Sequence, residues 1–141
     1  AYGKIEGYRP ADATVYTWYT TADGILEKNR SGNPDYEIPS RLKTLIETRD
    51  YGQYGNKQGE LRTCFAASNH TTGGNSGSPV LNAKGQLIGT NFDRNWEGTM
   101  SDVYYDINQV RNIVVDVRYT LFIIDKFAGA RHLVEEMTIV K

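Results

Sequence analysis

The stretch TTGGNSGSPVLNAKGQLIGTNFD, residues 71–93, determines how the rest of the chain is interpreted. Its first part is made of glycine and small polar residues, and its second part holds two short apolar runs separated by turn residues. Residues 79–81 and 86–92 are predicted strands, and the residues 82–85 between them are predicted to form a turn. The stretch therefore predicts a glycine-rich loop that leads into a β-hairpin.

Similar short β-branched and aromatic runs occur on both sides of this hairpin. Residues 61–68 and 113–117 are predicted strands. VYTWYTTADG, residues 15–24, predicts one more strand, which ends in a turn at Asp23 and Gly24. The chain holds 10 Tyr and 14 Gly, as expected for strands separated by tight turns. We expect a mainly β fold whose strands form a meander of antiparallel hairpins.

Two regions carry the spacing of short helices. The helical spacing in PSRLKTLIETRDYG is set by Leu42, Leu45 and Ile46. Ser40 is expected to cap the start of this helix, and Gly52 lies just past its end. From residue 118 onward, the apolar pattern predicts two helical stretches hinged at Gly129. Residues 27–37 are polar and are predicted to form a loop.

Composition bounds the possible partners. A chain of 141 residues with 39% hydrophobic residues is long enough for one core, so residues 1–141 are expected to form a single domain. The net charge of −1 gives no electrostatic sign of nucleic acid or anionic membrane binding, and the sequence shows no membrane span. The single cysteine, Cys64, excludes an internal disulfide and is expected to be a small buried side chain rather than a reactive thiol.

The glycine-rich loop has two interpretations. Gly, Asn, Ser and Pro are the commonest turn formers, so GGNSGSP is first of all a turn between strands. The second interpretation is chemical, because backbone N–H groups beside a nucleophile can stabilise the oxyanion that forms in acyl transfer. In that case Ser76 is the nucleophile, and Gly74 and Ser76 supply the N–H donors.

The order of the residues favours the chemical interpretation. GNSGSP resembles the GDSGGP signature of the chymotrypsin superfamily, in which the first serine is the nucleophile; this selects Ser76 and leaves Ser78 structural. Asn75 replaces the Asp that pairs with a new N-terminus in trypsin-like zymogens, so activation by cleavage of that type is not expected, and the nucleophile itself is unaffected. TTGGNSGSPV also resembles glutamyl endopeptidases, so this motif alone identifies the superfamily better than the family.

Longer segments carry a more specific resemblance. GQLIGTNFDRNWEGTMSDVYYD and VDVRYTLFIIDKFAGARHLVEEM resemble the bacterial dipeptidyl-peptidase 7 and 11 family, closest to type 11, and GILEKNRSGNPDYEIPSRLKTLIETRDYG fits it too. The resemblance implies a chymotrypsin-like double β-barrel, of which this chain would be the C-terminal barrel with short helices. Members of that family order their triad His, Asp, Ser, so the resemblance also implies that the catalytic His and Asp lie in polypeptide that precedes this chain. The absence of an initial Met suggests a mature or excised piece, although Met removal from an ordinary cytosolic protein would look the same.

The two histidines of the chain are not expected to replace that base. The resemblance gives His70 no such role, and His132 falls on a helix-like stretch beside apolar residues. A serine without a neighbouring base is a poor nucleophile, so negligible peptidase activity is expected of the 141 residues alone.

The resemblance also assigns two substrate-binding residues. It implies that Asp93 helps to bind the free α-ammonium of a peptide and that Arg94 selects Asp or Glu on the acyl side of the cleaved bond. A guanidinium matches a carboxylate through paired donors. Neighbouring residues of a regular strand point to opposite faces, so both can serve one site only if the strand ends or bulges there. Otherwise the two form a solvated strand end, paired with Glu97 or Asp102.

The expected partners are thus peptides with a free N-terminus and the remainder of the same polypeptide. Rival hypotheses are a glutamyl endopeptidase-like protease and a non-catalytic peptide-binding β-domain. No residue spacing typical of a metal site or a phosphate loop is present, so no cofactor and no metal are expected. The resemblance alone places the protein in the periplasm or at the cell surface of a Gram-negative bacterium and allows a homodimer of the full-length protein.

Overall fold

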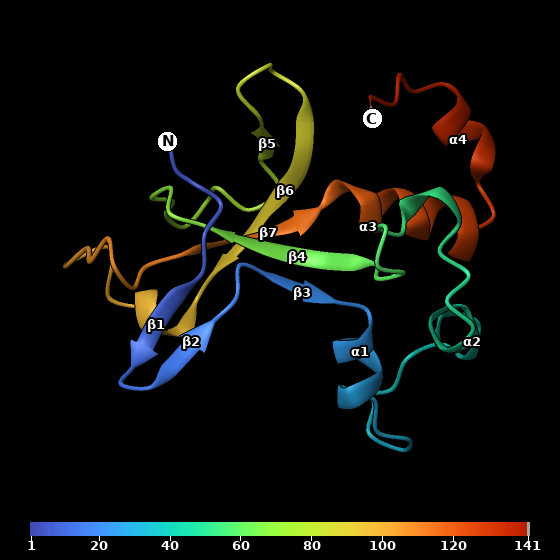
Figure 1. The fold of residues 1–141 in the computed structure, drawn as a ribbon, viewed down its shortest axis with the longest axis horizontal. Helices are drawn as coiled ribbons and strands as arrows, with labels where there is room; N and C mark the ends of the chain where they lie inside the picture. Colours follow the sequence, from blue (N-terminus) through green and yellow to red (C-terminus); the bar gives the residue numbers. More distant parts are fainter. Residues whose placement is uncertain (141) are drawn as a thin grey trace. The chain divides into compact units, whose positions relative to one another are not determined.

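The computed structural model describes residues 1–140, and its central element is a five-stranded sheet (Figure 1). The strands lie in the order β3-β4-β7-β6-β5. Their bounds are Tyr19–Thr21 for β3, Arg62–Ala67 for β4, Asn112–Asp116 for β7, Leu87–Arg94 for β6 and Pro79–Leu81 for β5. The pairs β5–β6, β6–β7 and β4–β7 are antiparallel. The predicted hairpin meander is therefore confirmed over β5, β6 and β7. It is wrong for β4, which pairs with β7 instead of with the next strand β5, because residues 68–78 between them form the loop that carries Ser76.

The predicted single strand over residues 15–24 is wrong. The segment is divided between two sheets: β2 (Thr14–Tyr16) pairs with β1 (Tyr8–Ala11) in a separate hairpin, and β3 then joins the large sheet. An edge-to-face contact between the rings of Tyr8 and Tyr16, with centroids 5.3 Å apart, holds the first hairpin. The backbone N–H of Ala66 donates to the carbonyl of Trp18, at the point where the chain changes sheets.

The helices follow the predicted regions with shifted ends. Asp23 begins the helix α1 (Asp23–Lys28) instead of a turn, since an acidic residue suits the positive end of a helix. Ser40 is the first residue of α2 (Ser40–Glu47), and Pro39 occupies the cap position without a side-chain hydrogen bond. The predicted loop is confirmed only after α1. At the end of the described chain lie α3 (Val117–Phe122), η3 (Ile123–Phe127) and α4 (Arg131–Glu135).

Gly129 separates η3 from α4 and has a φ of 70°. This left-handed conformation suits glycine and ends the first helical stretch. The two predicted helical stretches hinged at this residue are therefore confirmed. Sheets of short strands with short helices, including C-terminal helices, agree with the predicted fold class.

The chain divides into two compact units. The first contains Ala1–Thr20 and Thr63–Val117, and the second contains Thr21–Arg62 and the chain from Arg118 onward. The first unit buries apolar residues of β4, β7 and the connection before β7: Phe65, Ala67, Val110 and Val114. The second buries residues of its helices and loops: Ala22, Leu42, Ile46, Tyr51, Tyr54, Leu61, Leu121, Phe122 and Val134. The single domain over residues 1–141 stays a prediction.

A buried arginine organises the long connection between β6 and β7. The side chain of Arg111 is only 5% exposed and donates to the carbonyls of Gly7, Ile107 and Val110. Its backbone N–H donates to Asn95 Oδ1 at 2.7 Å, and the backbone N–H of Asn95 donates to the Arg111 carbonyl at 2.9 Å. These bonds fix both ends of the 95–111 connection, which contributes to the site described below.

Candidate active site

The loop that carries Ser76 is an extension of the β5–β6 hairpin. The backbone N–H of Gly77 donates to the carbonyl of Asn91 at 2.8 Å, and the backbone N–H of Asn91 donates to the carbonyl of Ser78 at the same distance. Gly77 has a φ of 86°, a conformation that side chains rarely adopt. The main chain around Ser76 is thus anchored to β6 by backbone hydrogen bonds.

Ser76 is exposed at the surface of this loop. Its Oγ lies 3.2 Å from the carbonyl oxygen of Phe92, to which the hydroxyl donates. Within residues 1–140, the backbone N–H groups of Gly74 and Ser76 have no hydrogen-bond acceptor. An accessible hydroxyl and unpaired N–H groups are two of the features that acyl transfer needs, and a neighbouring base is the third.

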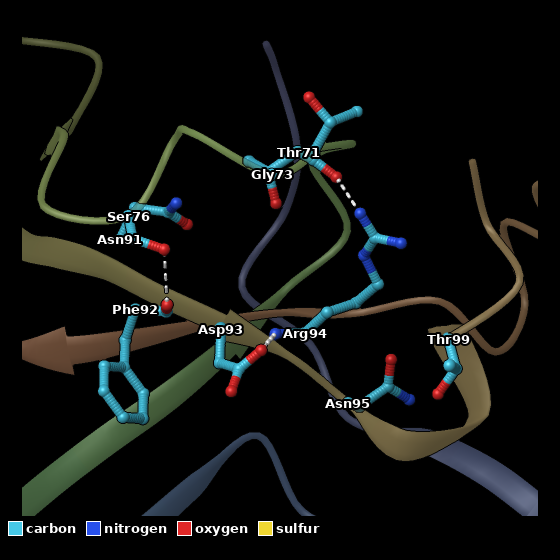
Figure 2. Close-up of a pocket in the computed structure, with 10 residues that line it drawn as sticks. Thr71, Gly73, Ser76, Asn91, Phe92, Asp93, Arg94, Asn95 and Thr99 are labelled. Carbon is cyan, nitrogen blue, oxygen red and sulfur yellow. Dashed lines mark hydrogen bonds between the residues drawn. The ribbon is translucent and has the colours of Figure 1, made fainter.

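A pocket of about 280 Å³ brings Ser76 together with Asp93 and Arg94 (Figure 2). Its other lining residues are Thr71, Thr72, Gly73, Asn91, Phe92, Asn95 and Thr99. Gly73, rather than Gly74, is the glycine that lines the pocket. Three of the four predicted site residues therefore share one cavity, and Gly74 lies in the same loop outside the lining.

A β-bulge explains how two neighbouring residues of β6 reach this cavity. Asn91 is opposite Val114 and Asp93 is opposite Ile113, so Phe92 is an extra residue on β6. The bulge breaks the alternation of side chains, and the strand ends at Arg94. The strand thus both bulges and ends here, as Asp93 and Arg94 require if they are to serve one site. The side chains of Asp93 and Arg94 nevertheless point in different directions (Figure 2).

The carboxylate of Asp93 lies close to its own backbone. Its Oδ1 accepts a hydrogen bond of 2.7 Å from the backbone N–H of Arg94. The residue is exposed, so its charge is available to a ligand in the pocket.

Arg94 is held by three groups. Its Nη2 donates to the carbonyl of Thr71 at 2.8 Å and to Asp102 Oδ1 at 3.0 Å, and its Nη1 donates to the carbonyl of Gly98 at 3.3 Å. Its side chain is only 16% exposed, so Arg94 is not a solvated strand end. The predicted pairing with Asp102 is present, whereas Glu97 accepts hydrogen bonds from Tyr8 and Asn95.

Neither histidine is placed in this pocket. The ring of His70 packs against the ring of Tyr105, with centroids 4.6 Å apart. His70 lines another cavity of about 810 Å³, which Ser78 but not Ser76 also lines. His132 lies in α4, in the second compact unit.

Cys64 lies in β4, opposite Val115 of β7. Burial raises the pKa of its thiol; a hydrogen bond with Thr20 acts in the opposite direction, and the charge of Asp116 raises the pKa further. A raised thiol pKa lowers the fraction of reactive thiolate, as expected of a residue that is not a reactive thiol. The expected full burial is wrong, because Cys64 is only partly buried and lines a cavity with Tyr16 and Trp18.

Among residues 1–140, no group of three or more His, Cys, Asp or Glu side chains is placed to hold a metal ion. Over the same residues, the structure contains no helix with the length and apolar character needed to cross a membrane.

Sequence reasoning missed several residues that shape the pocket. Thr71 contributes a backbone carbonyl, and its hydroxyl donates to Asn112 Oδ1 at 3.2 Å. Asn91 is buried, and its Oδ1 has no hydrogen-bond partner within residues 1–140. A contact made by a loop carbonyl depends on the tertiary path of the chain, so no sequence signal marks Thr71. Asn91 does have a sequence signal, because a polar amide within a run of strand residues can indicate a functional position.

Comparison with known proteins assigns this arrangement to a family. The family model described as Peptidase S46 matches residues 1–139. The chain is 54% identical over 140 residues to an Asp/Glu-specific dipeptidyl-peptidase of Capnocytophaga gingivalis, covering 99% of this chain and 20% of that protein. It is 49% identical to a dipeptidyl-peptidase 7 of Phocaeicola vulgatus, over 99% of this chain and 19% of that protein.

A solved structure shares the fold. The crystal structure of Porphyromonas endodontalis DPP11 in complex with the dipeptide Arg-Glu matches with a TM-score of 0.92 and 50% sequence identity, over 95% of this chain and 19% of that chain. This chain spans about a fifth of the length of the curated relatives it matches. The match along nearly all of its residues shows that the chain belongs to the peptidase S46 family, a family of serine peptidases.

Proposed function

We propose that the complete protein is a serine-type dipeptidyl-peptidase that releases N-terminal dipeptides and prefers Asp or Glu on the acyl side of the cleaved bond. The observation that carries the proposal is the pocket in which the exposed hydroxyl of Ser76 and the guanidinium of Arg94 lie together. Relatives named as Asp/Glu-specific dipeptidyl-peptidases support the same substrate class.

In this mechanism the chain supplies the nucleophile and the N–H groups that stabilise the oxyanion. Ser76 Oγ attacks the peptide carbonyl carbon, and the hydroxyl proton passes to a general base. The carbonyl oxygen becomes an anion, which the N–H groups of Gly74 and Ser76 stabilise. The tetrahedral intermediate collapses to an acyl-enzyme as the protonated amine leaves, and water then releases the dipeptide. The base and its orienting carboxylate are supplied by residues of the complete protein outside these 141.

Arg94 supplies the acidic preference. A substrate carboxylate beside the largely buried guanidinium gains charge-assisted hydrogen bonds, which an apolar side chain cannot form. Hydrogen bonds to charged groups contribute about 1.5–3 kcal/mol, which corresponds to roughly ten- to a hundredfold in turnover.

Asp93 supplies the exopeptidase character. An extended peptide advances about 3.3 Å per residue, so an ammonium group two residues from the cut lies within reach of a carboxylate that lines the same pocket. A blocked N-terminus carries no such charge and loses this contact. The dipeptide is therefore the unit released.

The test compares peptides with free and acetylated N-termini on the complete protein. Turnover of free peptides with Glu or Asp as the second residue should exceed that of acetylated peptides, and Arg94→Gln should lower acidic turnover about ten- to a hundredfold relative to neutral turnover. Equal cleavage after Glu in acetylated peptides would favour a glutamyl endopeptidase. Unchanged selectivity in Arg94→Gln would show that Arg94 is not the residue that selects acidic side chains.

The chymotrypsin-like double barrel stays a prediction from the resemblance, as do the periplasmic or cell-surface location and the homodimer of the full-length protein. To test the location, intact cells are treated with a protease, and the complete protein is then detected with an antibody. Protection of the protein until the outer membrane is opened would support a periplasmic site.

A further inference from the structure

The guanidinium of Arg94 already binds a carboxylate of this chain. Asp102 Oδ1 lies 3.0 Å from Arg94 Nη2, and the side chain of Asp102 is 57% exposed, compared with 16% for Arg94. Asp102 follows η2 (Trp96–Gly98), in the connection between β6 and β7. The pocket therefore contains an arginine whose charge is balanced before any substrate enters.

Three of the five guanidinium N–H donors of Arg94 already form hydrogen bonds. Nη2 has two hydrogens, of which one is donated to the Thr71 carbonyl and the other to Asp102. Nη1 donates one of its two hydrogens to the carbonyl of Gly98. Within residues 1–140, the donors left without an acceptor are Nε and the second hydrogen of Nη1.

The two free donors cannot form a paired contact with a carboxylate. A guanidinium binds a carboxylate most tightly through two parallel hydrogen bonds. Its paired edges are Nη1 with Nη2 and Nε with Nη2, because the arginine's own side chain blocks the third edge. Both edges require a hydrogen of Nη2. A substrate carboxylate can bind in this way only if the Thr71 carbonyl or Asp102 gives up its hydrogen bond.

Asp102 is the group that can leave. The Thr71 carbonyl belongs to the main chain, and the Thr71 hydroxyl is tied to the buried side chain of Asn112. Asp102 is exposed and turns into solvent by rotation of its side chain, where water replaces its hydrogen bond. Displacing an exposed carboxylate costs little, typically the energy of a surface ion pair.

We propose that Asp102 is a built-in competitor of the substrate carboxylate at Arg94. This inference rests on the proposed function, in which Arg94 reads the acidic residue. Asp102 neutralises the guanidinium in the empty pocket, weakens binding of acidic peptides and lowers the penalty for neutral ones. Removing its carboxylate should sharpen the acidic preference of the complete enzyme.

The experiment measures binding and turnover for Asp102→Asn in the complete protein. In a Ser76→Ala background, the dissociation constants of the dipeptides Arg-Glu and Arg-Gln are measured by calorimetry. Asp102→Asn should tighten Arg-Glu on the order of two- to fivefold, the range of an exposed ion pair, and leave Arg-Gln nearly unchanged or weaker. With Ser76 intact, KM for acidic peptides should fall by the same factor and kcat should stay within about twofold, since the competition acts on binding.

Two further variants serve as controls. Asp102→Glu keeps a carboxylate and should restore parental affinity. Asp106→Asn removes an equal charge from the same connection, where Asp106 Oδ1 accepts from the Asn108 N–H and not from Arg94, and it should change neither dipeptide's affinity by more than a small factor. A larger KM in Asp102→Asn would show that Asp102 merely orients Arg94 and would overturn the proposal. An unchanged KM, or an equal gain for Arg-Gln, would overturn it as well.

Failure of the proposed function has a different signature. If Arg94→Gln binds Arg-Glu as tightly as the parent does, Arg94 is not the acidic reader. If Arg94→Gln loses affinity for Arg-Glu while Asp102→Asn gains none, Arg94 does select the acidic residue, and only the proposed competition by Asp102 is wrong.

Discussion

The backbone N–H of Gly77 lies 2.8 Å from the carbonyl oxygen of Asn91. This bond joins the residue that follows Ser76 to a strand of the main sheet, while the Ser76 hydroxyl meets the carbonyl of Phe92 on the same strand. The position of the proposed nucleophile therefore depends on the backbone conformation of Gly77, whose φ is 86°.

Gly77→Ala should reduce the reactivity of Ser76 by tenfold or more. A Cβ at Gly77 has open space around it, so the cost is backbone strain of about 1–2 kcal/mol, which shifts the loop out of position. The matched control is Gly85→Ala, at a φ of 75° in the turn between β5 and β6 and also with open space. Labelling by a fluorophosphonate should be slowed in Gly77→Ala only. Equal effects in both variants would show that Ser76 does not depend on the local conformation.

Arg111→Met should loosen the connection between β6 and β7. The variant leaves three backbone carbonyls without their donor and removes the ion pair with Glu6, and we expect a local loss of about 2–4 kcal/mol. Hydrogen exchange of the β7 amides in the complete protein measures it. The control is Arg131→Met, an exposed arginine paired with Glu135, which should change exchange little. Parental exchange in Arg111→Met would refute the role of Arg111 in holding the connection between β6 and β7.

The phenol of Tyr8 should ionise at a higher pH than an ordinary tyrosine. Burial is the main cause that raises its pKa to about 12, from the ordinary value of 10.0. Because the folded state holds the proton more tightly than the unfolded state, the contribution of Tyr8 to stability is complete below pH 10 and is lost as the pH rises toward 12. A near-ultraviolet titration of the parent minus Tyr8→Phe should show one phenol ionising near pH 12. A difference curve centred near pH 10 would contradict this.

Cys64 should react slowly with alkylating reagents. Its raised pKa and its place in β4 leave little accessible thiolate at neutral pH. Mass spectrometry of the Cys64 peptide gives the rate of modification in native protein, and the same protein in denaturant is the control. The native rate should be at least tenfold lower. Equal rates would mean that the thiol is exposed.

The sequence predicted the elements that depend on local patterns. The hairpin of β5 and β6, the strands β4 and β7, and the helical break at Gly129 each follow from alternation, turn residues or glycine placement. The division of residues 15–24 between two sheets was not predictable from the strand pattern, because both halves are equally β-prone. The change of sheet depends on two pairings: β2 pairs with the preceding strand β1, whereas β3 joins β4, which lies much later in the sequence.

The candidate site was predictable to a similar extent. The motif around Ser76 and the neighbours Asp93 and Arg94 were identified from the residues and the resemblance, and the pocket brings these three together. The bulge at Phe92 was stated only as a condition, since it arises from the register between β6 and β7. The role of the Thr71 carbonyl could not be predicted, because backbone carbonyls of loops leave no trace in the residue pattern.

Labelling of the complete protein with a fluorophosphonate, followed by peptide mapping, tests the assignment of Ser76 most directly. Only an activated serine reacts with this reagent, and Ser78, whose carbonyl bonds to Asn91, provides the neighbouring control. The label should fall on Ser76, and Ser76→Ala should lose both labelling and dipeptide release while Ser78→Ala keeps both. A fully active Ser76→Ala protein, or a label carried by Ser78, would contradict the account.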